Sequence, residues 1–327
     1  MSCWGWRAIP DNPVIAEVIR SGFTESVHRG ALAVLTADGT LARQAGAAAS
    51  PAFPRSSNKP MQAAAMTECG LDLDGKLLAL AAASHSGEDY HVAGVREILA
   101  RAGLTEADLQ CPPDLPLDEQ AQRELLRAGG GPDRVHMNCS GKHAAMLATC
   151  VAAGWPTRAY RDPGHPLQQA IRQKVEQLSG EQVAATGVDG CGAPLFAISV
   201  TGLARAFRAM VLAGPGSAGR KVADAMRAHP EWTSGTTRPE RALMAAVPGL
   251  LVKSGAEGVE AFALADGRSA AFKIDDGAAR ARPAVTVALL AALGVPAAQL
   301  AGLGALAAPP VRGGGEVVGE IRAKIPD

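Results

Sequence analysis

The two ends of this 327-residue chain carry the same hairpin signature. In each case an Asp-Gly pair, Asp38-Gly39 near the front and Asp266-Gly267 near the back, separates two short apolar runs. These runs are residues 31–36 and 41–43 at the front and residues 259–264 and 270–274 at the back. Asp-Gly is a preferred turn of tight hairpins, because its backbone accepts the positive φ angles that such turns require. We therefore expect antiparallel strands at both ends of the chain.

The region between the hairpins has the pattern of helices, because its apolar residues recur at intervals of three and four. Helices are expected over residues 59–69, 87–102, 142–153, 166–178, 204–212 and 219–228, with a further apolar helix over 285–293. Strands from both termini around a helical middle imply one sheet covered by helices. The predicted fold is a single α/β domain over residues 1–327, in which the N- and C-terminal strands form an antiparallel sheet and the helical middle carries most of the site.

The composition is that of an ordinary globular protein, with 47% apolar residues, 20% charged residues and a formal net charge of zero. Balanced charge and only twelve aromatic side chains argue against a nucleic-acid groove, which needs a basic surface and stacking rings. The first residues show no apolar leader segment, and no later stretch is long and apolar enough to span a membrane. We expect a cytoplasmic protein.

The six cysteines are scattered without any Cys-x-x-Cys pair. A chain of this length can fold without covalent crosslinks, so we expect no disulfides. Cys69 and Cys150 are expected to be small buried apolar residues. Cys139 and Cys191 lie among polar and chemically active neighbours and are considered separately below.

A serine and a lysine occur three residues apart at Ser56 and Lys59. Residues at this spacing share one helix face, so the amine can reach the hydroxyl if a helix begins near Arg55. The same two residue types recur at Ser84 and at Lys253-Ser254-Gly255. This order of Ser-x-x-Lys, serine and Lys-Ser-Gly is typical of acyl-transfer sites in which lysine activates a serine.

Lysine is rare in this chain, with eight of the 32 basic residues, and three lysines avoid charged surroundings. Lys59, Lys142 and Lys253 lie in Ser- and Gly-rich, locally apolar stretches. Residues 250–253 are expected to form the strand that carries Lys253. Burial and a second nearby cation both lower the pKa of a lysine, so Lys59 and Lys253 in one pocket would lower each other's pKa and favour the neutral, serine-activating form.

The segment from Ser84 to Glu88 combines two hydroxyls, an imidazole and a carboxylate. Ser86, three residues before Asp89, has the spacing of a serine that caps the start of a helix. Both interpretations can hold together, with Ser84 facing the pocket and Ser86 capping the helix that follows.

A third cluster contains candidate metal ligands. Cys139, Lys142 and His143 have the spacing of one helix face, and the fold could bring Cys191 to them. Two thiolates brought together would suit zinc. Ligand chemistry alone favours His143 over Lys142 as the nitrogen donor, because a lysine must first lose its proton.

Taken together, these motifs resemble those of the rhizobial-type L-asparaginases, the inducible class 3 enzymes. The matching segments are Arg-Ser-x-x-Lys-Pro at 55–60, Ser-His-Ser-x-Glu-Asp at 84–89, Asn-Cys-Ser-Gly-Lys-His at 138–143, Asp-Gly-Cys at 189–191, His-Pro-Glu at 229–231 and Val-Lys-x-Gly at 252–255. They cover nearly the whole chain in the family's order and with similar spacing.

The resemblance implies a serine β-lactamase-like fold, a homodimer, and hydrolysis of L-asparagine to L-aspartate and ammonia. The site residues that it implies are the dyads Ser56–Lys59 and Ser84–Lys253, zinc ligands Cys139, Lys142 and Cys191, and the substrate-binding residues Asp189, His143 and Arg55. The implied zinc ion binds the amino-acid end of the substrate and does not activate water. One position departs from the family: Glu240 stands where the family can carry a cysteine near the substrate.

Two other functions fit part of the pattern. A β-lactamase or peptidase-like serine acyl hydrolase shares the Ser-x-x-Lys and Lys-Ser-Gly elements, but has no use for paired Cys139 and Cys191. A non-catalytic amino-acid-binding protein would bind asparagine without releasing ammonia. Binding alone does not require an activated nucleophile, so the presence of both serines and both lysines favours the enzyme.

Overall fold

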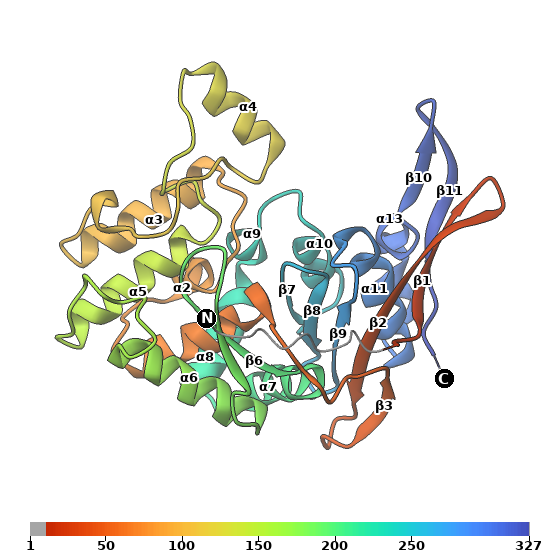
Figure 1. The fold of residues 1–327 in the computed structure, drawn as a ribbon, viewed down its shortest axis with the longest axis horizontal. Coiled ribbons are helices and arrows are strands. Elements are labelled where there is room, and N and C mark those ends of the chain that lie inside the picture. Colours follow the sequence, from red (N-terminus) through yellow and green to blue (C-terminus); the bar gives the residue numbers. More distant parts are fainter. Residues whose placement is uncertain (1–10, 327) are drawn as a thin grey trace, which may run out of the picture.

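The computed structural model describes residues 11–326 and shows an antiparallel sheet built from both ends of the chain (Figure 1). The strand order is β10-β11-β1-β2-β9-β8-β7, and β3 pairs with the C-terminal end of β2. The strands are β1 (Val14–Arg20), β2 (Phe23–Leu35), β3 (Leu41–Ala45), β7 (Leu251–Ser254), β8 (Val259–Ala263), β9 (Ser269–Ile274), β10 (Pro310–Gly313) and β11 (Glu316–Ala323). Cys3 and the two ends of the predicted 1–327 domain lie outside the described residues.

The two ends of the chain meet where β2 pairs with β9. Their register runs from Gly30 opposite Ile274 to Leu35 opposite Ser269. The predicted front hairpin is formed by β2 and β3, and the predicted back hairpin is formed by β8 and β9. The expected α/β fold, in which N- and C-terminal strands share one antiparallel sheet, is therefore confirmed.

Alternate residues of the central strands face two different cores, as the period-two geometry of a strand requires. One face presents mainly alanines, such as Ala33 of β2 and Ala261 of β8, to α7 and the helical region. The other face presents larger side chains, such as Phe262 and Phe272, toward α10 and α11. Small side chains on the first face let α7 pack closely on β2, β8 and β9.

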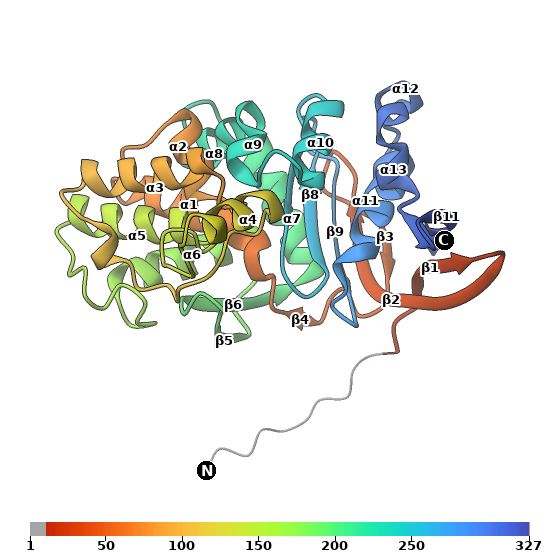
Figure 2. The same cartoon turned by 90° about the horizontal axis from the view of Figure 1, so that it is seen from above.

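Most helices gather at the end of the molecule away from the β1–β2 and β10–β11 hairpins, whereas α11, α12 and α13 lie beside these hairpins (Figures 1 and 2). Helix α1 lies at the centre of this group and contacts α5, α6 and α8. The helices are α1 (Lys59–Glu68), α2 (Gly75–Ala81), α3 (Asp89–Arg101), α4 (Glu119–Arg127), α5 (Ser140–Ala152), α6 (Pro166–Ser179), α7 (Val200–Leu212), α8 (Ala218–Ala228), α9 (Pro230–Thr233), α10 (Pro239–Ala246), α11 (Arg282–Ala292), α12 (Ala297–Leu300) and α13 (Gly304–Ala307). A second sheet, ordered β4 (Pro51–Ala52), β6 (Pro194–Ser199) and β5 (Ala185–Val188), lies below them in Figure 2.

All seven predicted helices are present, each within a few residues of its expected bounds. Two local expectations are wrong. Ser86 does not cap α3; its hydroxyl donates instead to the backbone oxygen of Ser234, 2.8 Å away, and the residue at the cap position is Glu88. Cys69 is partly exposed, whereas Cys150 is buried as expected. All five described cysteines are free thiols, and no described helix is long and apolar enough to cross a bilayer.

Candidate active site

Ser56 lies in a single 3-10 turn, Arg55–Asn58, that runs directly into α1. Arg55 has a φ of +51°, in the left-handed region, which costs a non-glycine residue about 1 kcal/mol or more. Gly255, directly after β7, packs closely against this turn. A Cβ added at Gly255 would lie only 2.5 Å from the backbone oxygen of Pro54. Glycine at this position therefore lets the Lys-Ser-Gly strand approach the serine turn.

Lys59 is fully buried at the first turn of α1 and contacts three polar partners. Its Nζ donates to the backbone oxygen of Ala83 at 2.6 Å, to Ser84 Oγ at 2.9 Å and to Cys139 Sγ at 3.1 Å. Ser56 Oγ has no hydrogen-bond partner among the described residues, and its side chain is partly exposed. The structure thus brings Lys59 to the second serine of the predicted site, Ser84, and leaves the Ser56 hydroxyl free of local partners.

Lys253 is buried at the end of β7, where its Nζ donates to the backbone oxygen of Ser254 at 2.7 Å. Burial, followed by the nearby charge of Lys59, lowers the pKa of Lys253 to about 7. Within the described chain no hydrogen bond joins Lys253 to Ser84. The pairing of Lys253 with Ser84 therefore stays a prediction. The charge of Lys59 does contribute to the lowered pKa of Lys253, as expected for two lysines in one pocket.

Lys142 and Cys191 form the centre of the sulfur cluster, with Nζ donating to Sγ at 3.1 Å. A hydrogen bond from the Cys139 thiol and the positive charge of Lys142 hold the pKa of Cys191 far below its usual range, although burial opposes this. Burial alone would lower the pKa of Lys142, but the thiolate of Cys191 raises it. His143 lies 2.7 Å from the Tyr160 hydroxyl through Nδ1, and its buried Nε2 has no partner among the described residues.

These residues fit the chemistry of a zinc site. Cys139 and Cys191 supply two sulfur donors, and the Lys142 amine lies against one of them. The Nε2 of His143, which has no hydrogen-bond partner among the described residues, is the other nitrogen close to the cluster. In the described part of the chain, no group of three or more His, Cys, Asp or Glu side chains is arranged to hold a metal. A zinc site here would therefore need the lysine nitrogen, which must lose its proton on binding.

Arg55 links the serine turn to the sulfur cluster. Its Nε donates to Asp189 Oδ1 at 2.8 Å, and its Nη1 lies 3.7 Å from Glu257 Oε1. Asp189 Oδ2 is in turn 3.9 Å from Cys191 Sγ. A guanidinium group and a carboxylate thus lie side by side at the edge of the site, which is the charge arrangement needed to bind an amino acid's carboxylate and ammonium groups.

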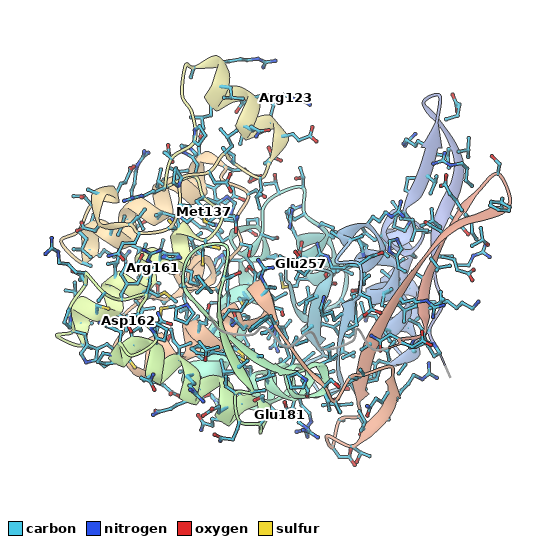
Figure 3. The ribbon with its side chains drawn as sticks, viewed as in Figure 1. Arg123, Met137, Arg161, Asp162, Glu181 and Glu257 are labelled. Atoms are coloured by element: carbon cyan, nitrogen blue, oxygen red, sulfur yellow. The ribbon has the colours of Figure 1, made fainter. Side chains whose placement is uncertain are left out.

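The site lies between the sheet and the helical region. Figure 3 shows Glu257 at this boundary, with Arg161 and Met137 on the helical side. The Met137 sulfur accepts a hydrogen bond from the backbone nitrogen of Cys139 at 3.1 Å. Arg161 covers the turn that carries Cys191, because its guanidinium occupies the space that a Cβ at Gly192 would need.

Sequence analysis missed a buried charged group behind β7. Glu240 and Glu260 are 1% and 3% exposed, and Arg282 lies near both carboxylates. A signal was present in the sequence: Glu260 is the only charged residue of the otherwise apolar strand β8. A carboxylate inside an apolar strand requires a partner, but the sequence does not say which basic residue supplies it.

Comparisons with known proteins give one match over nearly the whole chain and several weaker structural likenesses. No curated protein matches it. The structure is similar to Mglu in its native form, at 17% identity and a TM-score of 0.40, over 76% of this chain and 59% of the Mglu chain. It is also similar to a β-lactamase from Mycobacterium bovis, at 15% identity and a TM-score of 0.45, over 81% of this chain and 95% of the other.

A putative β-lactamase from Bacteroides dorei gives a further likeness, at 14% identity and a TM-score of 0.42, over 75% of this chain and 84% of the other. These likenesses are partial, and the assignment rests on the sequence. The family model described as L-asparaginase II matches residues 16–323, which include every candidate site residue named above. The chain belongs to the L-asparaginase II family.

Proposed function

We propose that this protein hydrolyses L-asparagine to L-aspartate and ammonia, with Ser56 as the nucleophile. Membership of the L-asparaginase II family supports the substrate. The observation that supports the chemistry is buried Lys59, which follows Ser56 by three residues and donates to Ser84, together with a pKa of about 7 at buried Lys253. A lysine of this pKa is partly neutral near neutral pH and can exchange protons during turnover.

The first half of the reaction transfers an acyl group to the enzyme. Ser56 Oγ attacks the side-chain carboxamide carbon while Lys59, neutral in the reacting form, accepts the hydroxyl proton. The tetrahedral intermediate then loses its C–N bond, and the proton passes to the nitrogen so that ammonia departs. Ser84, which accepts a hydrogen bond from Lys59, and Lys253 relay this proton. The product of this half is an ester between Ser56 and the aspartyl group.

The second half returns the enzyme to its starting state. Water gives a proton to the lysine pair and adds to the ester carbon, and the Ser56 oxygen leaves with that proton as a hydroxyl. The products are L-aspartate and the free serine. The Ser56 backbone N–H is one available donor for the oxyanion, because the turn Arg55–Asn58 opens α1.

The amino-acid end of the substrate has its own binding groups in this proposal. Arg55 and Asp189 offer one positive and one negative group within 2.8 Å of each other. Zinc, held by Cys139, Lys142 and Cys191, would supply positive charge that binds an α-amino or α-carboxylate group. We also propose that the protein is a homodimer that acts on a small-molecule substrate and not on nucleic acid. Light scattering of the purified protein tests the dimer.

The test is ammonia release from L-asparagine and from L-glutamine by the purified protein, with and without added zinc. Ser56→Ala should abolish release from asparagine, because no other group forms the ester. Ser50→Ala changes an exposed serine in the preceding segment and serves as the matched control. Full turnover by Ser56→Ala would refute its assignment. Absence of release by the native protein from both substrates, at any zinc level, would refute the asparaginase proposal and favour β-lactam hydrolysis or simple binding.

A further inference from the structure

The two site residues of the Lys-Ser-Gly element face opposite sides of the sheet. Lys253 and Ser254 are neighbours in β7, so their side chains alternate between its two faces. Lys253 pairs with Ala261, which belongs to the core on the helical side, so Lys253 faces the side of the sheet where Lys59 and Ser84 lie. Ser254 faces α10, where its hydroxyl donates to Glu240 Oε1. The strand that carries the active-site lysine is therefore held from behind by a carboxylate.

A set of four charged residues surrounds this contact on the far face. Ser254 pairs across the sheet with Glu260, so both side chains lie on the same face. Arg282 Nη1 lies 3.1 Å from Glu260 Oε2 and 3.8 Å from Glu240 Oε1. Arg238 Nε lies 3.8 Å from Glu240 Oε2. Two carboxylates and two guanidinium groups thus balance one another behind β7.

Such a group is an expensive way to stabilise a fold. Glu240 is 1% exposed, and replacing a buried charged set by apolar residues of similar volume is often neutral or stabilising. Its Oε2 atom also lacks a hydrogen-bond partner among the described residues. The contact of Glu240 with Ser254, the residue next to Lys253, suggests a role other than stability.

We propose that Glu240 is a positioning residue for the active-site lysine: it fixes the Ser254 end of β7 and supplies the negative charge that offsets the cations around Lys253. Glu240 does not touch the reacting atoms in this proposal. It acts through the strand and through its electric field, from the face opposite the serines. This role extends the proposed function and depends on it only for the kinetic consequence described last.

The charges around Lys253 come from three elements. Lys59 on α1, Arg282 on α11 and Arg238 directly before α10 favour the neutral amine, whereas Glu240 on α10 favours the ammonium. Burial alone would raise the pKa of Glu240, but Arg238, Lys253 and Arg282 hold it at about 2, so this residue is charged at neutral pH. Removing the Glu240 charge should lower the pKa of Lys253 below about 7.

The direct test is titration of Lys253 by NMR in protein labelled with ¹³C at the lysine Cε. The chain has only eight lysines, and Lys253→Met identifies the resonance by its disappearance. Glu240→Gln should move the titration midpoint of Lys253 down by about one pH unit, a tenfold change in proton affinity. Glu240→Asp keeps the negative charge, so the titration midpoint of Lys253 in this variant should stay close to that of the native protein.

Glu260→Gln is the matched control, because Glu260 is a similarly buried carboxyl group that also contacts Arg282 but makes no side-chain hydrogen bond to Ser254 among the described residues. Its effect on the Lys253 midpoint should be clearly smaller. Equal shifts in the two variants, or no shift in Glu240→Gln, would overturn the proposal. If Glu240→Gln does not fold, Arg238→Gln is the second test, because the Arg238 side chain is 30% exposed. Loss of this positive charge should raise the titration midpoint of Lys253. An unchanged midpoint in Arg238→Gln would overturn the proposal as well.

The kinetic consequence separates this inference from the proposed function. If the protein releases ammonia from L-asparagine, the acidic limb of kcat/KM against pH should shift in Glu240→Gln by the same amount as the NMR midpoint. If the native protein shows no such activity, the proposed function fails, while the NMR titration still tests the role of Glu240.

Discussion

Lys142 and Lys253 are buried to the same degree, yet their surroundings shift their pKa values in opposite directions. Both side chains are about 1% exposed, and burial alone lowers the pKa of each. Lys142 lies against the Cys191 thiolate, which raises its pKa, whereas at Lys253 burial and the charge of Lys59 outweigh the carboxylate of Glu240 and lower the pKa to about 7. Because burial acts on both lysines in the same direction, the neighbouring charges decide which pKa is raised and which is lowered.

This difference agrees with the different tasks proposed for the two lysines. The Cys191 thiolate keeps the Lys142 amine in a fixed place, which suits a group that binds a substrate or a metal. The cationic environment of Lys253 suits a group that gains and loses a proton near neutral pH. Lys59 connects the two regions, since its Nζ donates to Ser84 at 2.9 Å and to Cys139 at 3.1 Å.

The largest expected effect is on turnover. Lys253→Met should lower kcat for L-asparagine by about 10²–10⁴-fold, the usual contribution of a proton-transfer group. Lys142→Met should act mainly on KM, because it removes a binding group. Steady-state kinetics over a range of asparagine concentrations separates the two cases, with exposed Lys221→Met as the control. An equal fall in kcat for both variants would show that the two lysines do not differ in task.

The next effect concerns the metal. Zinc titration of the purified protein against a chromophoric chelator should show a site that weakens by about 100-fold or more in Cys191→Ala, because a sulfur ligand is lost. Cys150→Ala removes a buried thiol outside the cluster and should leave zinc affinity unchanged. Native protein that binds no zinc would disprove the zinc site and leave the cluster as an ammonium–thiolate pair.

The smallest effect is on stability against pH. The folded-state pKa of Lys253, about 7, lies below the ordinary value of 10.5, so between these limits the unfolded chain binds a proton that the folded chain does not. Stability should therefore rise with pH in this window. From pH 7 to pH 9, the free energy of unfolding of the native protein should gain about 2 kcal/mol relative to Lys253→Met.

Urea unfolding of both proteins at pH 7, 8 and 9 measures this difference. The comparison between the two proteins removes the contributions of the other titrating groups. A constant difference across the three pH values would mean that Lys253 titrates outside this window in the folded state, and the contrast with Lys142 would disappear.

Much of the fold could be predicted because its signals are local. The Asp-Gly turn at residues 38–39 and the apolar period of residues 166–178 depend only on neighbouring residues. The elements that were missed are short or weakly patterned. Helix α10 has only eight residues, and its buried face includes the charged Glu240. Strand β6 is buried along its whole length and shows no alternation of apolar and polar side chains. Periodicity identifies an element only where one face is apolar and the other is not.

The site was predicted less completely than the fold. Ser56 and Lys59 were found because they lie at helical spacing, but Lys59 donates to Ser84 and Cys139, which are 25 and 80 residues away in the chain. Glu240 was noticed only as a departure from the related family, and its contact with Ser254 could not be inferred. The sequence alone does not indicate which face of the strand packs against α10.

The amino-acid sequence by itself determined the two Asp-Gly hairpins, the helices between them and the residue types available for chemistry. It did so because turn preference and apolar periodicity act over a few residues. Only the tertiary structure decided which of the buried lysines meets a thiolate and which meets other cations. Electrostatic interactions depend on distances through space, and packing sets these distances between residues that lie far apart in the chain.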